Sequence, residues 1–383
     1  MTDGNRKVAV VGVALSDCGR VDDATPYALH AQAARRALAD AGLDRSLIDG
    51  FASAGTGVLA PVEVAEYLGL RPTWVDSTSV GGSTWEVMAA HAADAIAAGH
   101  ANAVLLVYGS TARADIRAGR RTGNLSFGAR GPLQFEVPYG HTLIAKYAMA
   151  ARRHMIEHGT TIEQLAEVAV QARQNAALNP EAMFQDPITI DDVLSGPMIA
   201  DPFTKLHCCI RSDGGAAVLL AAEEYVRDCR KAPVWVLGSG ECVSHSAMSE
   251  WEDFTVSPAA VSGRLAFERA GVRPTEIDVA EIYDAFTYMT LVTLEDLGFC
   301  KKGEGGAFVQ ARELPVNTDG GGLSAQHPGM RGLFLLVEAV RQLRGECEAR
   351  QVRCGDGELP RLAVASGTGG WFCSSGTVVL GRA

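Results

Sequence analysis

Two short polar clusters interrupt apolar parts of the sequence and carry groups that can transfer protons. Residues 281–286 contain Tyr283 and Asp284 directly after an expected strand, and residues 324–329 contain His327 between a glycine turn and an expected helix. Phenol, carboxyl and imidazole groups serve as general acids and bases. A loop histidine is more often structural, however, and a tyrosine at a strand end usually belongs to the core. The two clusters therefore need a scaffold that brings them together.

Glycine-rich turns can present backbone N–H groups to a ligand. The sequence has four candidates, at residues 80–83, 212–215, 319–322 and 366–370. None continues as Gly-Lys-Ser/Thr, and none opens a unit with GxGxxG spacing. Nucleotide hydrolysis and dinucleotide redox chemistry are therefore disfavoured.

The expected elements repeat along the chain. Residues 41–49 and 270–278 share Ala, Gly, Ile and Asp at a constant offset of 229 residues. In both halves a strand, a helix, a strand, a glycine turn, a helix and a strand follow in this order, which predicts parallel or mixed sheets covered by helices. The sequence predicts an N-terminal half over 1–232 and a C-terminal half over 233–383, with an inserted region at 111–201.

The insert has a charge of its own. Residues 111–158 hold eight Arg and Lys against three Asp and Glu, in a chain whose net charge is −11. A local cationic patch suits an anionic ligand, and Arg forks suit phosphates. A solvated or subunit-facing surface is the alternative, and both interpretations stay open.

Composition excludes several classes of protein. The 383 residues are 47% hydrophobic and 21% charged, which is typical of a soluble globular chain. The acidic balance argues against a general nucleic-acid binder. The nine cysteines form no CxxC pair and fit no zinc template, so we expect no metal and a reduced cytoplasmic location. The apolar run Val8–Leu15 is too short to span a bilayer, so we expect no membrane insertion.

Over essentially its whole length the sequence resembles the thiolase superfamily. Within it, the resemblance is to the sterol carrier protein x and lipid-transfer-protein branch, and there to the thiolase-like aldolases of steroid side-chain degradation. The segments that carry it are 179–180, 212–217, 283–286, 326–328, 338–345 and 350–352. The resemblance implies a duplicated five-layer αβαβα fold with an inserted loop domain, working as a homodimer on acyl-CoA.

The departures from the thiolase pattern change the expected chemistry. Ser79 stands where a thiolase has its nucleophilic cysteine, and a hydroxyl is a far poorer nucleophile than a thiolate. The branch's His-Asp/Asn-Cys-Phe block reads Tyr283-Asp284-Ala285-Phe286, whereas its second histidine is kept as His327. The sequence therefore predicts carbon–carbon cleavage of a β-hydroxyacyl-CoA by a retro-aldol reaction, without a covalent acyl-enzyme.

By this resemblance, His327 donates to the thioester oxygen and Tyr283 transfers a proton, with nearby donors lowering its pKa. Asp284 orients a water or caps a loop, and Tyr288 is a weaker candidate. Backbone N–H groups at Ser79, or in a final glycine loop containing Gly367 and Gly369, hold a second oxygen. The predicted substrate and CoA contacts are Arg120, Arg121, Tyr139, His141 and Gly322. No cofactor is expected beyond the CoA of the substrate.

Three other functions stay open: a true 3-ketoacyl-CoA thiolase, a non-catalytic lipid or acyl-CoA carrier, and an acyltransferase subunit. The branch also often works with a small partner that carries a zinc ribbon and an OB-fold, which would give a heterotetramer. The absence of cysteine at position 79 opposes the thiolase.

Overall fold

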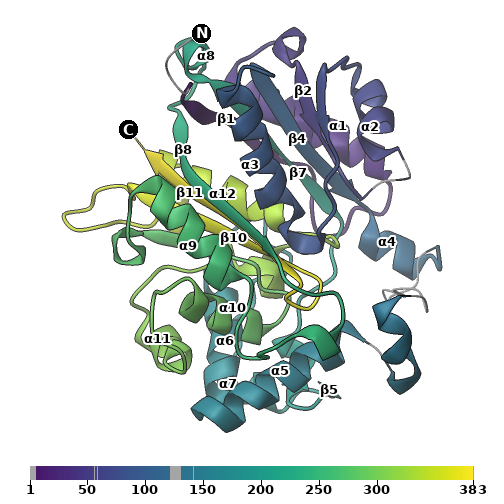
Figure 1. The fold of residues 1–383 in the computed structure, drawn as a ribbon, viewed down its shortest axis with the longest axis vertical. Coiled ribbons are helices and arrows are strands. Elements are labelled where there is room, and N and C mark those ends of the chain that lie inside the picture. Colours follow the sequence, from purple (N-terminus) through teal and green to yellow (C-terminus); the bar gives the residue numbers. More distant parts are fainter. Residues whose placement is uncertain (1–5, 56, 58, 121–130, 141, 383) are drawn as a thin grey trace.

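One mixed β-sheet joins the two halves of the chain in the computed structural model, which describes residues 6–55, 57, 59–120, 131–140 and 142–382 (Figure 1). Among the described residues, the sheet has nine strands in the order β3-β2-β4-β7-β1-β8-β11-β10-β9. The N-terminal half supplies β1 (Val8–Leu15), β2 (Gly50–Ala52), β3 (Trp74–Asp76), β4 (Ala103–Ser110) and β7 (Gly214–Ala222). The C-terminal half supplies β8 (Val234–Val243), β9 (Val279–Ile282), β10 (Leu362–Gly369) and β11 (Ser374–Arg382).

Two helices form a central layer between the strands of the two halves. They are α3 (Thr84–Ala97) and α12 (Gly332–Arg344), and each contacts strands of both halves. Helices α1 (Pro26–Ala41) and α2 (Ala60–Leu68) cover the N-terminal strands from outside, and α9 (Ala259–Ala270) covers the C-terminal strands. Strand β7 and nearly all of α12 are buried, as this layering requires. This is the layered α/β architecture that the resemblance implies.

The internal repeat has a local physical cause. Gly42 and Gly271 end α1 and α9 in the left-handed conformation, with φ of 74° and 67°. Glycine has no Cβ to oppose that conformation. A single 3₁₀ turn follows each glycine, at Arg45–Leu47 and Pro274–Glu276, and the chain then enters β2 or β9.

The inserted region is largely helical. It holds α4 (Ala112–Arg117), α5 (Leu143–His158), α6 (Ile162–Ala177), α7 (Ile190–Leu194), and β5 (Met198–Ala200), which pairs with β6 (Phe203–Thr204). Helix α6 packs against α10 (Thr287–Asp296), α11 (Gly305–Ala311) and a π-helical turn at Gly321–Ala325. The short helix α8 (Glu223–Val226) links β7 toward β8. Through these contacts the insert supports the C-terminal half (Figure 1).

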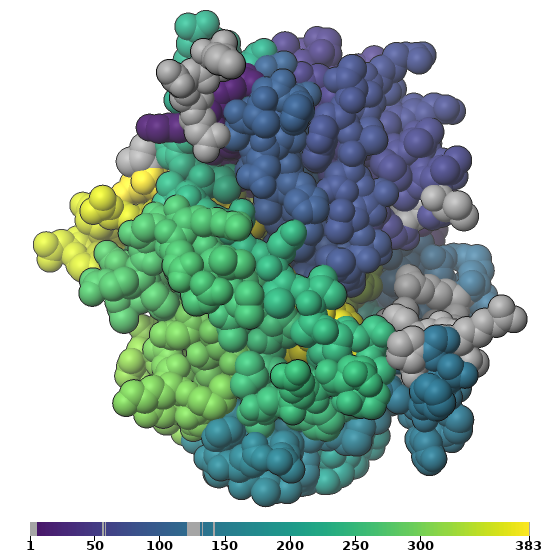
Figure 2. All heavy atoms as spheres, viewed as in Figure 1, coloured from purple at the N-terminus to yellow at the C-terminus, as the bar shows by residue number. Residues whose placement is uncertain are grey.

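The space-filling view shows a recess where the two halves and the insert meet. In Figure 2, yellow atoms of the C-terminal segment lie recessed between the blue N-terminal half, the green segment near residue 250 and the teal insert. None of the described helices combines the length and the apolar character needed to cross a bilayer.

The packing of α9 on β8 gives a test of the fold. A Cβ at Gly240 would overlap the carbonyl oxygen of Ser262 in α9. We expect Gly240→Ala to destabilise the protein by about 1–3 kcal/mol, because overpacking forces the helix away from the strand. Thermal unfolding measures the loss, and Ser239→Ala on the same strand is the control. An unchanged melting temperature for Gly240→Ala would contradict this packing.

Candidate active site

Tyr283 is held at the carboxyl end of β9, where ligands of α/β proteins commonly bind. Strand β9 pairs in parallel with β10, and the Tyr283 N–H donates to the carbonyl of Ser366 at 3.0 Å. The side chain is buried, with its ring against Gly82, where a Cβ would overlap the phenol carbon. The N-terminal half therefore leaves room for this tyrosine by placing a glycine there.

His327 lies in the loop between the π-helical turn and α12, and residues of the N-terminal half hold it in place. Its N–H donates to the hydroxyl of Ser212 at 2.9 Å, and the Ser212 N–H donates to the His327 carbonyl at 3.4 Å. The hydroxyl of Tyr108 donates to the carbonyl of Pro328 at 2.7 Å. His327 as a whole is half-buried.

The predicted proton-transfer group, Tyr283, meets His327, the predicted donor to the thioester oxygen. The Tyr283 hydroxyl lies 3.2 Å from His327 Nε2, and the rings are nearly perpendicular, at 85°. Which atom donates depends on the histidine tautomer. The pair couples a phenol from β9 to an imidazole that the N-terminal half positions.

Burial makes this pair neutral. It raises the pKa of Tyr283 well above its usual range, which corrects the expectation that nearby donors lower it. Burial, and next the Arg331 guanidinium, lower the pKa of His327 to about 4. At neutral pH the site therefore holds a phenol beside an uncharged imidazole, whose unprotonated ring nitrogen can accept a hydrogen bond from the phenol.

Two glycine segments, one from each half, touch beside this pair. A Cβ at Gly81 would come within 2.8 Å of Gly369, and a Cβ at Gly369 would overlap the carbonyl oxygen of Val80. Ser83 and Ser374 share a hydrogen bond of 2.8 Å across the same contact. The glycines thus allow the backbones of the two halves to approach directly.

The predicted final glycine loop is shorter than expected. Gly367 and Gly369 belong to β10 and pair with Gly376 and Ser374 of β11, because the strand continues to Gly369. Ser79 is exposed, next to the N-terminal glycine turn. Its role as an oxyanion donor, like that of the two glycines, stays a prediction.

Asp284 fixes the loop that carries His327. Its carboxylate accepts the N–H groups of Gly322 and Leu323, at 2.6 and 3.2 Å, and lies 3.5 Å from Arg331 Nε. Burial raises its pKa to about 7, against the opposing effect of Arg331. These contacts favour the loop-capping interpretation over a water-orienting role. Gly322, a predicted CoA contact, lies under the His327 ring, since its Cβ would come 3.0 Å from that ring.

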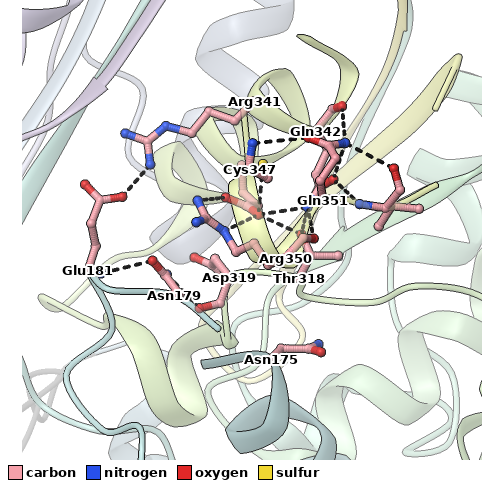
Figure 3. A network of polar contacts seen from close by, with 12 residues as sticks. Asn175, Asn179, Glu181, Thr318, Asp319, Arg341, Gln342, Cys347, Arg350 and Gln351 are labelled. Atoms are coloured by element: carbon pink, nitrogen blue, oxygen red, sulfur yellow. Dashed lines mark hydrogen bonds and ion pairs between the residues drawn. The ribbon is translucent and has the colours of Figure 1, made fainter. Parts of the chain in front are cut away.

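Three of the segments that carry the resemblance, 179–180, 338–345 and 350–352, meet in a polar network behind the loop (Figure 3). Arg350 binds the Glu338 carboxylate through two hydrogen bonds of 3.0 Å, and Thr318 donates to the same carboxylate at 2.8 Å. Asn179 donates to the carbonyl of Asp319 at 2.9 Å, and the Asp319 carboxylate accepts from Arg331. The network anchors residues 318–319 immediately before the glycine turn.

The other predicted residues lie elsewhere or outside the description. The Tyr288 hydroxyl donates to the carbonyl of Phe254 at 3.0 Å from a fully buried position on α10. Arg120 pairs with Asp115, and Tyr139 is 90% exposed on a 3₁₀ turn. Arg121 and His141 lie outside the described residues.

Ion pairs neutralise much of the basic insert. Five of its cations have carboxylate partners, namely Arg113, Arg120, Lys146, Arg152 and Arg153. Arg113, for example, reaches both Asp22 and the buried Asp213. These pairs weigh toward the structural interpretation of the insert's charge.

None of the nine cysteines is activated. All are free thiols, and burial raises the pKa of each, to about 11 for Cys373 and about 12 for Cys208. Reactive cysteines instead have lowered pKa values. Within the described ranges, no cluster of His, Cys, Asp or Glu is arranged to hold a metal ion.

Sequence reasoning missed Arg331 and Glu86, and it named Ser212 and Asp319 only as members of glycine turns, without their supporting roles. Arg331 and Asp319 form a buried ion pair, Ser212 holds His327, and Glu86 lies buried near Gly367. One signal was available: Glu86 is the only acid in the otherwise apolar first turns of α3. The partners of the others are distant in sequence, so no local pattern points to them.

The role of Asp284 can be tested by removing its charge while keeping its shape. In Asp284→Asn the amide group must face a buried backbone N–H, a mismatch that costs about 1–3 kcal/mol. We expect a lower melting temperature and faster hydrogen exchange in peptides covering 319–331. Asp278→Asn is the matched control, because Asp278 accepts two backbone N–H groups in a partly exposed place. Unchanged exchange in Asp284→Asn would overturn the assignment.

Comparison with known proteins agrees with this architecture. Residues 240–382 match the family described as "Thiolase C-terminal domain-like". An acetyl-CoA acetyltransferase of Methanothermobacter thermautotrophicus is 33% identical over 95% of this chain and 97% of the relative. The 17-hydroxy-3-oxo-4-pregnene-20-carboxyl-CoA lyase of Mycobacterium tuberculosis is 33% identical over 88% and 92%. A solved "Ltp2-ChsH2(DUF35) aldolase" has a TM-score of 0.87 at 28% identity, over 98% of both chains. The chain therefore belongs to the thiolase superfamily, in its lipid-transfer-protein branch.

Proposed function

We propose that the protein cleaves a β-hydroxyacyl-CoA to a ketone and a shortened acyl-CoA by a retro-aldol reaction. A steroid side-chain thioester with a tertiary alcohol is the proposed substrate, supported by the names of the lyase and aldolase relatives. The observation that carries the proposal is the Tyr283–His327 contact of 3.2 Å in a scaffold without an activated thiol. No cofactor beyond the CoA of the substrate is needed, and the proposed location is the cytoplasm.

The neutral pair can act as a proton relay. The β-hydroxyl proton passes to the Tyr283 oxygen while the phenol proton passes to His327 Nε2. The carbon–carbon bond breaks, its electron pair forms the enolate of the acyl-CoA, and the alcohol carbon becomes a ketone. His327 then returns its proton through Tyr283 to the enolate carbon, so protons balance and the pair is restored.

The relay fits the tautomer in which Nε2 accepts from the phenol. In the other tautomer Nε2–H is a donor, as the expected bond to the thioester oxygen requires. We favour the relay because the Tyr283 hydroxyl already lies within hydrogen-bond distance of His327 Nε2. Backbone N–H groups at the turn beginning with Ser79 are the proposed donors to the thioester oxygen, since Gly367 and Gly369 pair within the sheet.

Thiolysis of a 3-ketoacyl-CoA is the second candidate, because one relative is named an acetyltransferase. It needs a thiolate, whereas Ser79 occupies the expected position and the cysteines are protonated thiols. A non-catalytic carrier and an acyltransferase subunit differ from the proposed lyase in what they would do with an acyl-CoA. A carrier would bind acyl-CoA without bond cleavage, and a transferase would need an acceptor.

Tyr283→Phe tests the relay. Incubation with a tertiary β-hydroxyacyl-CoA should give ketone and acyl-CoA with the wild type. Because general acid–base groups contribute about 10²–10⁴-fold, we expect kcat to fall by that factor in Tyr283→Phe. Tyr27→Phe, which removes a hydroxyl bonded to Glu63 at the surface, is the control. Full activity of Tyr283→Phe would refute the relay, and thiolysis of a 3-ketoacyl-CoA without retro-aldol cleavage would favour the second candidate.

We also propose a homodimer that binds a small zinc-ribbon/OB-fold partner. The solved aldolase relative is named for two components, which supports a multi-subunit assembly. Edge strand β3 leaves Val75 exposed, and Val62 and Tyr67 on α2 are exposed as well. An unpaired edge beside exposed apolar side chains is typical of a subunit contact.

Val75→Asp tests the dimer contact. A charge on the edge strand should oppose pairing, so light scattering should show a dimer for the wild type and a monomer for the variant. Ile156→Asp, at an exposed apolar position on α5, is the control and should stay dimeric. Purification from the native host tests the heterotetramer, because two copies of a partner should then accompany each dimer of this chain. A monomeric wild type with full activity would contradict the assembly.

A further inference from the structure

Glu86 is a buried acid that the proposed relay does not use. It lies in the first turn of α3, and its side chain is 0% exposed. Neither carboxyl oxygen has a hydrogen-bond partner among the described residues. An unpaired buried polar group costs stability, so such groups call for an explanation.

Glycines of the C-terminal half make the space for this carboxyl. A Cβ at Gly367 in β10 would overlap Glu86 Oε2, and one at Gly332, where α12 begins, would lie 2.6 Å from it. A Cβ at Gly376 in β11 would lie 2.9 Å from the Glu86 Cβ. Three elements of the C-terminal half therefore have glycine where they face this one carboxyl group of the N-terminal half.

The niche is directly behind the catalytic turns. Gly367 precedes Gly369, which touches the N-terminal glycine turn, and the space beside Gly332 borders the carbonyl oxygen of Gly82. Gly82 in turn packs on the Tyr283 ring; burial is the main cause of the raised pKa of that phenol, and a negative charge on Glu86 would raise it further. Glu86 thus acts on the site across one layer of glycine backbone.

The surroundings hold few other charges. Strands β1, β2, β7 and β10, which pack near α3, contain no ionisable side chain. The remaining ionisable groups on the packed elements are Tyr108 on β4, Glu241 and Cys242 on β8, Arg382 on β11, and Glu338, Arg341 and Arg344 on α12. Glu241 pairs with His91, and Glu338 with Arg350. Arg331 forms ion pairs with Asp319 and Asp284.

We propose that Glu86 is a positioning residue of the cleavage site, held as an uncharged carboxylic acid so that negative charge can develop in front of the glycine turns. This inference rests on the proposed retro-aldol function. The reaction places negative charge on the enolate, and a fixed anion behind the turns would oppose it.

Burial raises the pKa of Glu86 to about 8, which agrees with a neutral form at pH 7. Loss of the proton above that pH would add a negative charge to the niche. We therefore expect kcat/KM of the wild type to fall tenfold per pH unit above about pH 8. Glu86→Gln keeps the shape but has no proton to lose, so its kcat/KM should stay level through this range.

The pH profile separates this role from a merely structural one. A structural role would lower the activity of Glu86→Gln by the same factor at every pH and leave the alkaline fall in place. Asp296→Asn is the matched control: Asp296 is another buried acid with a raised pKa, remote from the turns, and its variant should keep the wild-type profile. An alkaline fall retained in Glu86→Gln, or absent from the wild type, would overturn the proposal.

A second measurement does not depend on turnover. In the unfolded chain Glu86 ionises near its ordinary pKa of 4.5, whereas in the folded protein it stays neutral up to about pH 8. Between these values the unfolded state binds fewer protons, so the stability of the wild type falls as pH rises. The melting temperature of the wild type should therefore drop by several degrees relative to Glu86→Gln between pH 5 and 8.

The two measurements distinguish failure of the proposed function from failure of the Glu86 assignment. If no β-hydroxyacyl-CoA is cleaved but the pH-dependent difference in melting temperature is present, the proposed function is wrong and the buried neutral acid stands. If cleavage occurs but that difference is constant with pH, the function stands and the assignment of Glu86 is wrong.

Discussion

The direct approach of two glycine backbones, one from each half, is the constraint on which the rest of the structure depends. Gly81 and Gly82 of the N-terminal half lie against Gly369 and the Tyr283 ring of the other half, at distances that allow no Cβ. Close backbone approach is a main use of glycine. Because the halves meet here without side chains between them, a phenol from one half can lie beside backbone of the other. The central helices α3 and α12 hold this geometry through contacts with both sets of strands.

Much of the scaffold follows from local sequence patterns. The repeat of residues 41–49 at 270–278 corresponds to matching helix ends, because its glycines, Gly42 and Gly271, end α1 and α9. The pairing of Tyr283 with His327 follows from the resemblance, because 44 residues separate them and no local pattern joins them. Local rules succeed where the interactions that fix an element lie within the element.

The errors concern properties that depend on distant neighbours. The pKa of Tyr283 shifts upward because the assembled fold buries the phenol, and a segment of six residues gives no measure of burial. Gly367 and Gly369 suggest a loop by composition, but pairing with β11 makes them strand. For Asp284 the sequence leaves water orientation and loop capping open, and only the two N–H groups 38 and 39 residues away favour loop capping. Each case requires the tertiary neighbours, which composition does not encode.

The junction between β1 and β8 has a consequence for how such a protein can evolve. Only Ala9–Trp235 and Val10–Val234 pair there, so the sheet passes from one half to the other through a narrow seam. One half supplies a glycine turn and the clamp on the His327 loop, and the other supplies the phenol and the imidazole. A duplicated chain with such a division of labour can exchange single reactive groups in either half, as at Ser79 and Tyr283, while the layers behind them stay intact. A scaffold suited to thiol chemistry can in this way acquire a phenol-based reaction without being rebuilt.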